Sequence, residues 1–170
     1  KGFSKILENF FYENQKVNTK HKIHPLAIVH KNTKIGKNVF IGAYSTICEN
    51  VTIEDDTYIS ERVTISSNCK IGKKCFVGVG VVIECTSLNE KVTVAHNTVL
   101  GKIGFGFIPN KSKTILTPHI GGLVIGKGTY IGSSCNIDRG LIDNTSIGKY
   151  VMIDNQVHNG HNCIIKDFCI

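Results

Sequence analysis

The chain has 170 residues and a net charge of +7, enough for one domain with a hydrophobic core. Its positive charge is spread over single lysines, so the basic stripe with interleaved aromatic residues that is typical of nucleic-acid binding is missing. No apolar run approaches the ~20 residues of a membrane-spanning helix. We therefore expect no nucleic-acid partner and no transmembrane segment. Diffuse positive charge suits acidic small ligands or an acidic protein partner.

Residues 1–22 predict a short helix followed by a linker. An apolar face with helical i, i+3, i+4, i+7, i+8 spacing is formed by Phe3, Ile6, Leu7, Phe10 and Phe11. Because so short a helix is marginal on its own, this face needs a surface to dock on. The polar stretch 12–22 then leads into the next segment.

From Ile23 onward an aliphatic residue recurs every six positions, and a small residue follows it four positions later. A period of six fits neither a helix nor simple alternation, but it fits a short strand followed by a tight corner. Three such strands close one triangular coil, and coils stack at the ~4.8 Å spacing of neighbouring strands. The sequence therefore predicts an all-β fold, a left-handed parallel β-helix, over residues 23–170. The aliphatic positions are Ile23, Val29, Ile35, Ile41, Ile47, Ile53, Ile59, Ile65, Ile71, Val77 and Ile83, and the small positions run from Ala27 to Ser87.

The repeat is interrupted twice. Its phase breaks after Ser87 and resumes through Val94 and Leu100, and a non-repeating loop then spans about 101–122. The aliphatic positions return at Ile125, Ile131 and Ile137, skip an insertion, and continue at Ile147, Ile153 and Ile165. Glycines such as Gly36 directly follow the aliphatic position, where we expect the tightest turn.

The seven cysteines contain no CxxC pair, so neither zinc nor disulfides are indicated. Five of them fall in the small interior position and are interpreted as compact core residues, namely Cys69, Cys75, Cys135, Cys163 and Cys169. Cys48 and Cys85 lie outside that position and stay unassigned.

A stacked prism has no internal cavity, so we look for a site on an outer face, in a loop or between subunits. The first candidate is the loop that carries Gly104, Phe105, Gly106 and Phe107. Loops of this length without their own structure are often functional. The alternative interpretation is a surface flap.

The second candidate is a cluster of amide, carboxylate and imidazole groups late in the repeat. His161 stands two positions after the aliphatic position, so its side chain should point outward. Histidine exchanges a proton near neutral pH, which suits a general base. The alternative is a solvated polar face; the other histidines, His21, His24, His30, His96 and His119, are predicted to lie on the surface or in loops. The residues expected to support His161 are Asp154, Asn155, Gln156, His158 and Asn162.

Taken together, the hexads, the Gly-Phe-Gly-Phe loop, residues 137–140 (Ile-Asp-Arg-Gly), Asp154-Asn155-Gln156 and His161-Asn162 resemble the UDP-3-O-acylglucosamine N-acyltransferases of lipid A biosynthesis. The resemblance runs from about Lys1 to Ile170. No single motif carries it, because hexads mark a large superfamily, but the ordered combination is specific.

This resemblance implies a cytoplasmic homotrimer from a Gram-negative bacterium, with sites between subunits. It implies transfer of a 3-hydroxyacyl chain from acyl carrier protein to the 2-amino group of a UDP-linked acylglucosamine, with His161 as general base. No metal and no redox cofactor is expected, and residues 1–22 would be the end of a uridine-binding domain. Two positions depart from the family pattern: Asn159 fills an aliphatic position, and Ile103 stands where the family usually has Asp.

Other functions remain open at this stage. A hexapeptide-repeat sugar acyl- or acetyltransferase of another type would share the fold and the base. A non-catalytic or degenerate β-helix scaffold would share the fold alone. A γ-class carbonic anhydrase-like zinc protein needs three convergent histidines, of which His158 and His161 offer two.

Overall fold

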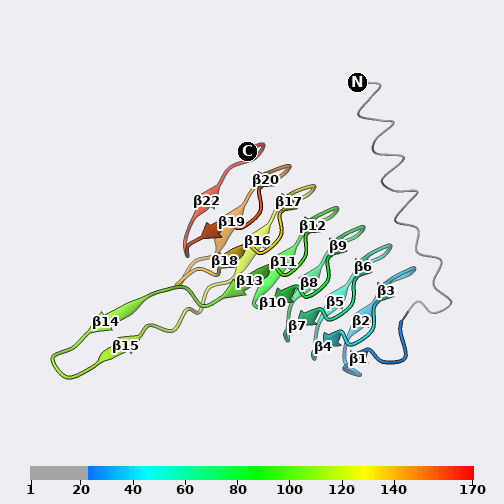
Figure 1. The fold of residues 1–170 in the computed structure, drawn as a ribbon, viewed down its shortest axis with the longest axis horizontal. Coiled ribbons are helices and arrows are strands. Elements are labelled where there is room, and N and C mark those ends of the chain that lie inside the picture. Colours follow the sequence, from blue (N-terminus) through cyan, green and yellow to red (C-terminus); the bar gives the residue numbers. More distant parts are fainter. Residues whose placement is uncertain (1–22) are drawn as a thin grey trace.

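The computed structural model describes residues 23–170, so the helix and linker predicted for 1–22 lie outside the described residues. Short strands wind into a parallel β-solenoid whose coils stack along one axis (Figure 1). The predicted parallel β-helix is confirmed: each strand pairs in parallel with its equivalent one coil away, in register at the hexad positions.

Three sheets form the sides of the prism. The first contains β1 (Ile28–Val29), β4 (Thr46–Ile47), β7 (Thr64–Ile65), β10 (Val82–Ile83), β13 (Val99–Lys102), β18 (Asn136–Asp138) and β21 (His158–Asn159). The second contains β2 (Lys34–Ile35), β5 (Thr52–Ile53), β8 (Lys70–Ile71), β11 (Thr86–Leu88), β16 (Leu123–Ile125), β19 (Thr145–Ile147) and β22 (Ile164–Ile165). The third contains β3 (Phe40–Ile41), β6 (Tyr58–Ile59), β9 (Phe76–Val77), β12 (Thr93–Val94), β17 (Tyr130–Ile131) and β20 (Met152–Ile153).

The interior is filled as the hexads predict. The aliphatic positions from Ile41 to Ile137 are essentially inaccessible to solvent. Hydroxyls in the small positions also bind neighbouring coils: Ser45 Oγ donates to the Ser60 carbonyl at 2.7 Å and accepts from Val63 N–H at 3.1 Å. Thr57 makes the same pair of bonds. Polar residues are therefore tolerated in the core because the adjacent backbone satisfies them.

The corners demand an unusual backbone. Non-glycine residues with φ between 54° and 65° recur every six positions, for example Asn38, Tyr44 and Asn50. This left-handed conformation costs roughly 1 kcal/mol per residue. The predicted turn at Gly36 needs correction, because its φ is not positive. A Cβ there would instead lie 2.6 Å from Asp55 N in the next coil, so close packing between coils excludes a side chain.

The phase break after Ile83 is shorter than predicted. Leu88 pairs with Ile71 and takes the aliphatic position, while buried Thr86 takes the small position that the hexads gave to Ser87. One residue is missing from this corner, where Cys85 has φ 42°. The repeat therefore resumes at Leu88, one strand earlier than the sequence indicated.

The predicted loop 101–122 has structure of its own. Its strands β14 (Phe107–Pro109) and β15 (Thr114–Leu116) pair antiparallel into a hairpin. This hairpin projects away from the solenoid (Figure 1). The expectation of a loop without internal structure was therefore wrong.

The interpretation of the cysteines is confirmed for three and wrong for two. Cys69, Cys75 and Cys135 are buried, whereas Cys163 and Cys169 are exposed. Both exposed residues lie in the last coil that the structure describes. Burial raises the pKa of the Cys69 and Cys75 thiols to about 11.

Neighbouring residues on β7 provide a test of the register. Ile65 is fully buried, whereas Thr64 beside it faces outward. We expect Ile65→Asp to destabilise the fold by more than about 4 kcal/mol, because a carboxylate would be buried without a partner. Thr64→Asp is the control and should change stability by less than about 1 kcal/mol. Urea unfolding of both variants measures this, and similar midpoints would contradict the inward assignment.

Thiol reactivity should divide the cysteines by burial. At pH 8 a pKa of about 11 leaves on the order of one Cys69 or Cys75 in a thousand as thiolate, and burial blocks the reagent as well. We expect iodoacetamide to modify Cys85, Cys163 and Cys169 in the native protein and to spare Cys69 and Cys75. Peptide mass spectrometry measures this, with labelling in urea as the control. Rapid native modification of Cys69 would show that the core assignment is wrong.

Candidate active site

All the interruptions of the repeat meet at one corner of the prism. The last three of the chain segments that connect the first sheet to the second are 103–122 after β13, 139–144 after β18 and 160–163 after β21. These three strands are hydrogen-bonded neighbours, so the three segments lie on successive coils. The Gly-Phe-Gly-Phe loop and His161 are therefore parts of one place, called the insertion corner below.

Backbone and side-chain bonds tie the three segments together. Ile120 N–H donates to the Leu141 carbonyl at 2.8 Å, and Leu141 N–H donates to Asn162 Oδ1 at 2.9 Å. Asn162 N–H in turn donates to Thr145 Oγ1 at 2.9 Å. The hairpin base, the short insertion and the His161 corner thus form one connected unit.

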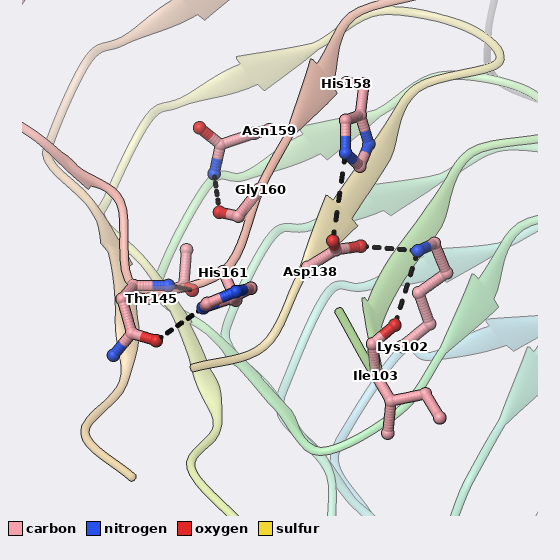
Figure 2. A network of polar contacts seen from close by, with 9 residues as sticks. Lys102, Ile103, Asp138, Thr145, His158, Asn159, Gly160 and His161 are labelled. Atoms are coloured by element: carbon pink, nitrogen blue, oxygen red, sulfur yellow. Dashed lines mark hydrogen bonds and ion pairs between the residues drawn. The ribbon is translucent and has the colours of Figure 1, made fainter. Parts of the chain in front are cut away.

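His161 lies at the centre of this corner. Its Nδ1 is 2.8 Å from Asn162 Oδ1 (Figure 2). That oxygen also accepts the Leu141 N–H, so it is an acceptor and His161 Nδ1 must be the donor. In the neutral ring this assignment leaves the lone pair on Nε2, the nitrogen that would have to take a proton.

The His161 side chain does not accept the backbone hydrogen bond that side chains at the same position in other coils accept. Asp55, Asn155 and His96 occupy the same position, two residues after the aliphatic one. Their side chains accept a backbone N–H from the coil below, at 2.8, 2.7 and 3.0 Å. At the insertion corner the corresponding N–H, that of Arg139, donates to the Lys102 carbonyl instead. The ring of His161 is therefore left available for other contacts.

The location predicted for His119 from the sequence was wrong. It was predicted to lie on the surface or in a loop, but it is only 3% exposed. Its ring meets that of His161 edge to face, with centroids 4.8 Å apart. Gly104 and Gly106 pack against it: a Cβ at Gly104 would lie 2.9 Å from His119 Nε2 and 2.8 Å from His161 Cδ2. The glycines of the Gly-Phe-Gly-Phe segment are thus explained by the two imidazoles.

The side chains of that segment are largely exposed. Phe105 is 82% exposed and Phe107 49%, and their rings meet edge to face at 5.4 Å. Together with Thr114 and Leu116 they line a shallow hollow on the hairpin. An apolar arm of this size beside the imidazoles is unusual for a surface in contact with water.

A buried carboxylate lies beside the same corner. Asp138 is 1% exposed, its Oδ1 is 2.6 Å from Lys102 Nζ, and its Oδ2 is 3.9 Å from His158 Nε2 (Figure 2). His158 is exposed and comes from the strand β21 that leads to His161. The predicted outward position of His158 is therefore confirmed, and its nearest charged neighbour is Asp138.

Three of the predicted supporting residues lie at a different corner. Asp154, Asn155 and Gln156 follow β20 and connect the third sheet to the first, one strand before His161. Asp154 Oδ1 accepts the Asn155 N–H at 2.7 Å, and Asn155 Oδ1 accepts the Ser133 N–H. Gln156 is exposed with φ 59°. Their bonds serve the corner, and their part in substrate binding stays a prediction.

The structure also locates the two residues that depart from the family pattern. Asn159 takes the interior position of β21 opposite Ile137, half-buried, with Nδ2 3.5 Å from the Gly160 carbonyl. Ile103 is exposed, and its carbonyl accepts from Lys102 Nζ at 3.4 Å.

Among residues 23–170 no cluster of three or more His, Cys, Asp or Glu side chains could hold a metal ion. In the same part of the chain we find no helix of the length and apolarity that a membrane crossing needs.

The fold and repeat define the chain as a hexapeptide-repeat β-solenoid protein. A family model described as bacterial transferase hexapeptide (six repeats) matches residues 32–67, and one described as hexapeptide repeat of succinyl-transferase matches 62–102. Among solved structures, an Arabidopsis UDP-N-acetylglucosamine acyltransferase is similar with a TM-score of 0.70 and 27% identity, covering 85% of this chain and 51% of that one. The Campylobacter jejuni enzyme of that name (TM-score 0.55, 24% identity, 86% and 48% covered) shows the fold alone.

Within this class the chain is similar to the UDP-3-O-acylglucosamine N-acyltransferases, as its motifs predicted. The Acinetobacter baylyi protein of that name is 51% identical over 136 residues, or 80% of this chain and 37% of the relative. The Leptospira biflexa protein is 37% identical over 90 residues, or 53% of this chain and 26% of the relative. The chain thus spans about a third of the length of these relatives.

The pair of Lys102 and Asp138 gives a stability prediction. Lys102→Met would leave a buried carboxylate without its cation, and we expect this to cost about 3 kcal/mol. Asp138→Asn should cost less, because the partly exposed Lys102 ammonium can then be hydrated. The double variant should be more stable than Lys102→Met alone. Denaturant unfolding of the four proteins measures the cycle, and an unaffected Lys102→Met variant would contradict the pairing.

Proposed function

We propose that this chain carries the catalytic corner of an N-acyltransferase. The enzyme would move a 3-hydroxyacyl chain from acyl carrier protein to the 2-amino group of UDP-3-O-acylglucosamine in the cytoplasm of a Gram-negative bacterium, without a metal or redox cofactor. The observation that carries the proposal is His161, whose Nδ1 is bonded to Asn162 so that Nε2 is free to act as a base. The names of the similar proteins supply the acceptor sugar.

The chemistry follows from that tautomer. The substrate amine attacks the thioester carbonyl carbon, and His161 Nε2 takes the proton that the amine loses as the C–N bond forms. The C–S bond then breaks, and the imidazolium returns the proton to the departing thiolate. Asn162 Oδ1 stabilises the imidazolium by accepting its Nδ1–H throughout, in the manner of the orienting carboxylate of a catalytic triad.

Two further features support the proposal. The exposed Phe105 and Phe107 offer an apolar surface beside His161, which suits an acyl chain or a second subunit that covers it. A homotrimer with its sites between subunits would bury this arm. The net charge of +7 suits an acidic carrier protein and a nucleotide diphosphate.

His161→Ala tests the assignment of the base. We expect acyl transfer to fall about 10²–10⁴-fold, with little change in melting temperature because the side chain fills no core. His158→Ala should be milder, and His30→Ala, a corner histidine far along the solenoid, should have no effect. Transfer from 3-hydroxyacyl carrier protein to UDP-3-O-acylglucosamine is measured for the chain and for a chimera. In this chimera the chain replaces the matching segment of the Acinetobacter baylyi relative.

The chimera separates two kinds of failure. If the chimera transfers acyl groups and His161→Ala retains most of that activity, the base is misassigned. If the chimera itself is inactive while the relative is active, the residues of this chain do not support the reaction, and the proposed function is wrong. Replacing Asn159 or Ile103 by the relative's residues then shows whether those positions are responsible.

A further inference from the structure

The insertion corner holds a second imidazole that the proposed reaction does not use. His119 Nδ1 lies 2.9 Å from the Thr117 carbonyl, which can only accept, so Nδ1 is the donor. In the neutral ring the lone pair is then on Nε2, and this atom is buried without a hydrogen-bond partner. An orphaned acceptor in the interior is destabilising, so such groups are rare unless they serve another purpose.

The surroundings of this nitrogen point to His161. Among the described residues 23–170 no donor bonds to His119 Nε2, and the ring is held edge to face against that of His161. Gly104 permits this approach, because any side chain there would meet both rings. In the part of the chain that the structure describes, no carboxylate bonds to either imidazole. The contacts of His161 are thus Asn162 at Nδ1, His119 at the ring and Gly104 below it.

We propose that His119 is a positioning residue for His161, an inference that rests on the proposed function. Its ring fixes the orientation of His161 so that Nε2 faces the substrate. The electron-rich ring of His119 also stabilises the cation that His161 becomes when it takes the amine proton. A cation is attracted to the face of an aromatic ring, and the two rings meet edge to face with their centroids 4.8 Å apart. The Thr117 carbonyl increases the electron density of His119 by accepting its Nδ1–H. The insertion after β13 therefore supplies a part of the site, through the segment that follows β15.

The activity test uses three variants. His119→Phe keeps a buried ring but removes the Thr117 bond and the lone pair, whereas His119→Gln keeps polar groups that can donate and accept. We expect kcat to fall about tenfold for His119→Phe, with KM for both substrates within about twofold, and His119→Gln to recover part of the loss. His30→Phe is the matched control and should leave kcat unchanged. A His119→Phe enzyme with the kcat of the original protein would overturn the proposal.

A spectroscopic readout works without turnover. Imidazole ¹⁵N shifts distinguish a protonated nitrogen from one with a lone pair, and both His119 and His161 should show Nδ1–H with a free Nε2 in the histidine-labelled chain. His119→Phe should move the His161 nitrogen signals, and His30→Phe should not. Unmoved His161 signals would overturn the positioning role even if the enzyme is active. If the signals move while His161→Ala retains activity, the contact is real and the proposed base is wrong.

If the His119 variants fail to fold, Gly104→Ala gives the same information with both imidazoles present. Its Cβ would lie 2.8 Å from His161 Cδ2 and 2.9 Å from His119 Nε2, so at least one of the two rings must move. We expect a loss of kcat similar to that of His119→Phe and a displaced His161 signal. A Gly104→Ala protein with normal kcat and normal His161 signals would contradict the proposal.

Discussion

The structure depends on the parallel stacking of coils at the distance of neighbouring strands. Each residue then lies directly on its equivalent in the next coil, three hexads away along the chain. A side chain must therefore suit the residues above and below it. Isoleucine fills the interior because a column of identical branched side chains packs without gaps, as the fully buried run from Ile41 to Ile71 shows. Hydroxyls such as Ser45 Oγ are accepted in the same columns because the adjacent coil offers a carbonyl and an N–H.

This constraint also decides where chemistry can occur. Insertions cannot leave from the middle of a strand without breaking the ladder, so they leave at corners. The solenoid places the insertions after β13 and β18 at the same corner, and β21 brings His161 beside them. At the other corners, side chains such as Asp55 Oδ1 bind the coil below. At the insertion corner the Lys102 carbonyl accepts the corresponding N–H, that of Arg139, so the His161 imidazole is left available.

Most of the fold could be predicted from the period of six, because every coil repeats the same local problem. The errors occurred where the period fails. The corner at Cys85 is one residue shorter than the hexads predict. The period of six therefore placed Ser87 in the small interior position that Thr86 occupies. Residues 101–122 have no hexad, so their hairpin could not be derived. His161 was identified by its register, but His119 was not, because its burial results from contacts between segments far apart in the sequence. The Gly-x-Gly spacing of 104–106 was the available signal: it indicated that something had to lie close.

The stability of the stacked interior offsets two kinds of cost, one at the strained corners and one at the insertion corner. Residues such as Asn38 and Tyr44 adopt positive φ because the stacked interior holds them there. The interior likewise offsets the cost of burying Asp138 beside Lys102 and of leaving His119 Nε2 without a partner. A loop on a less rigid scaffold would relax such groups toward water. On stacked coils they stay in place, so two imidazoles from distant segments can remain in contact with a fixed relative orientation.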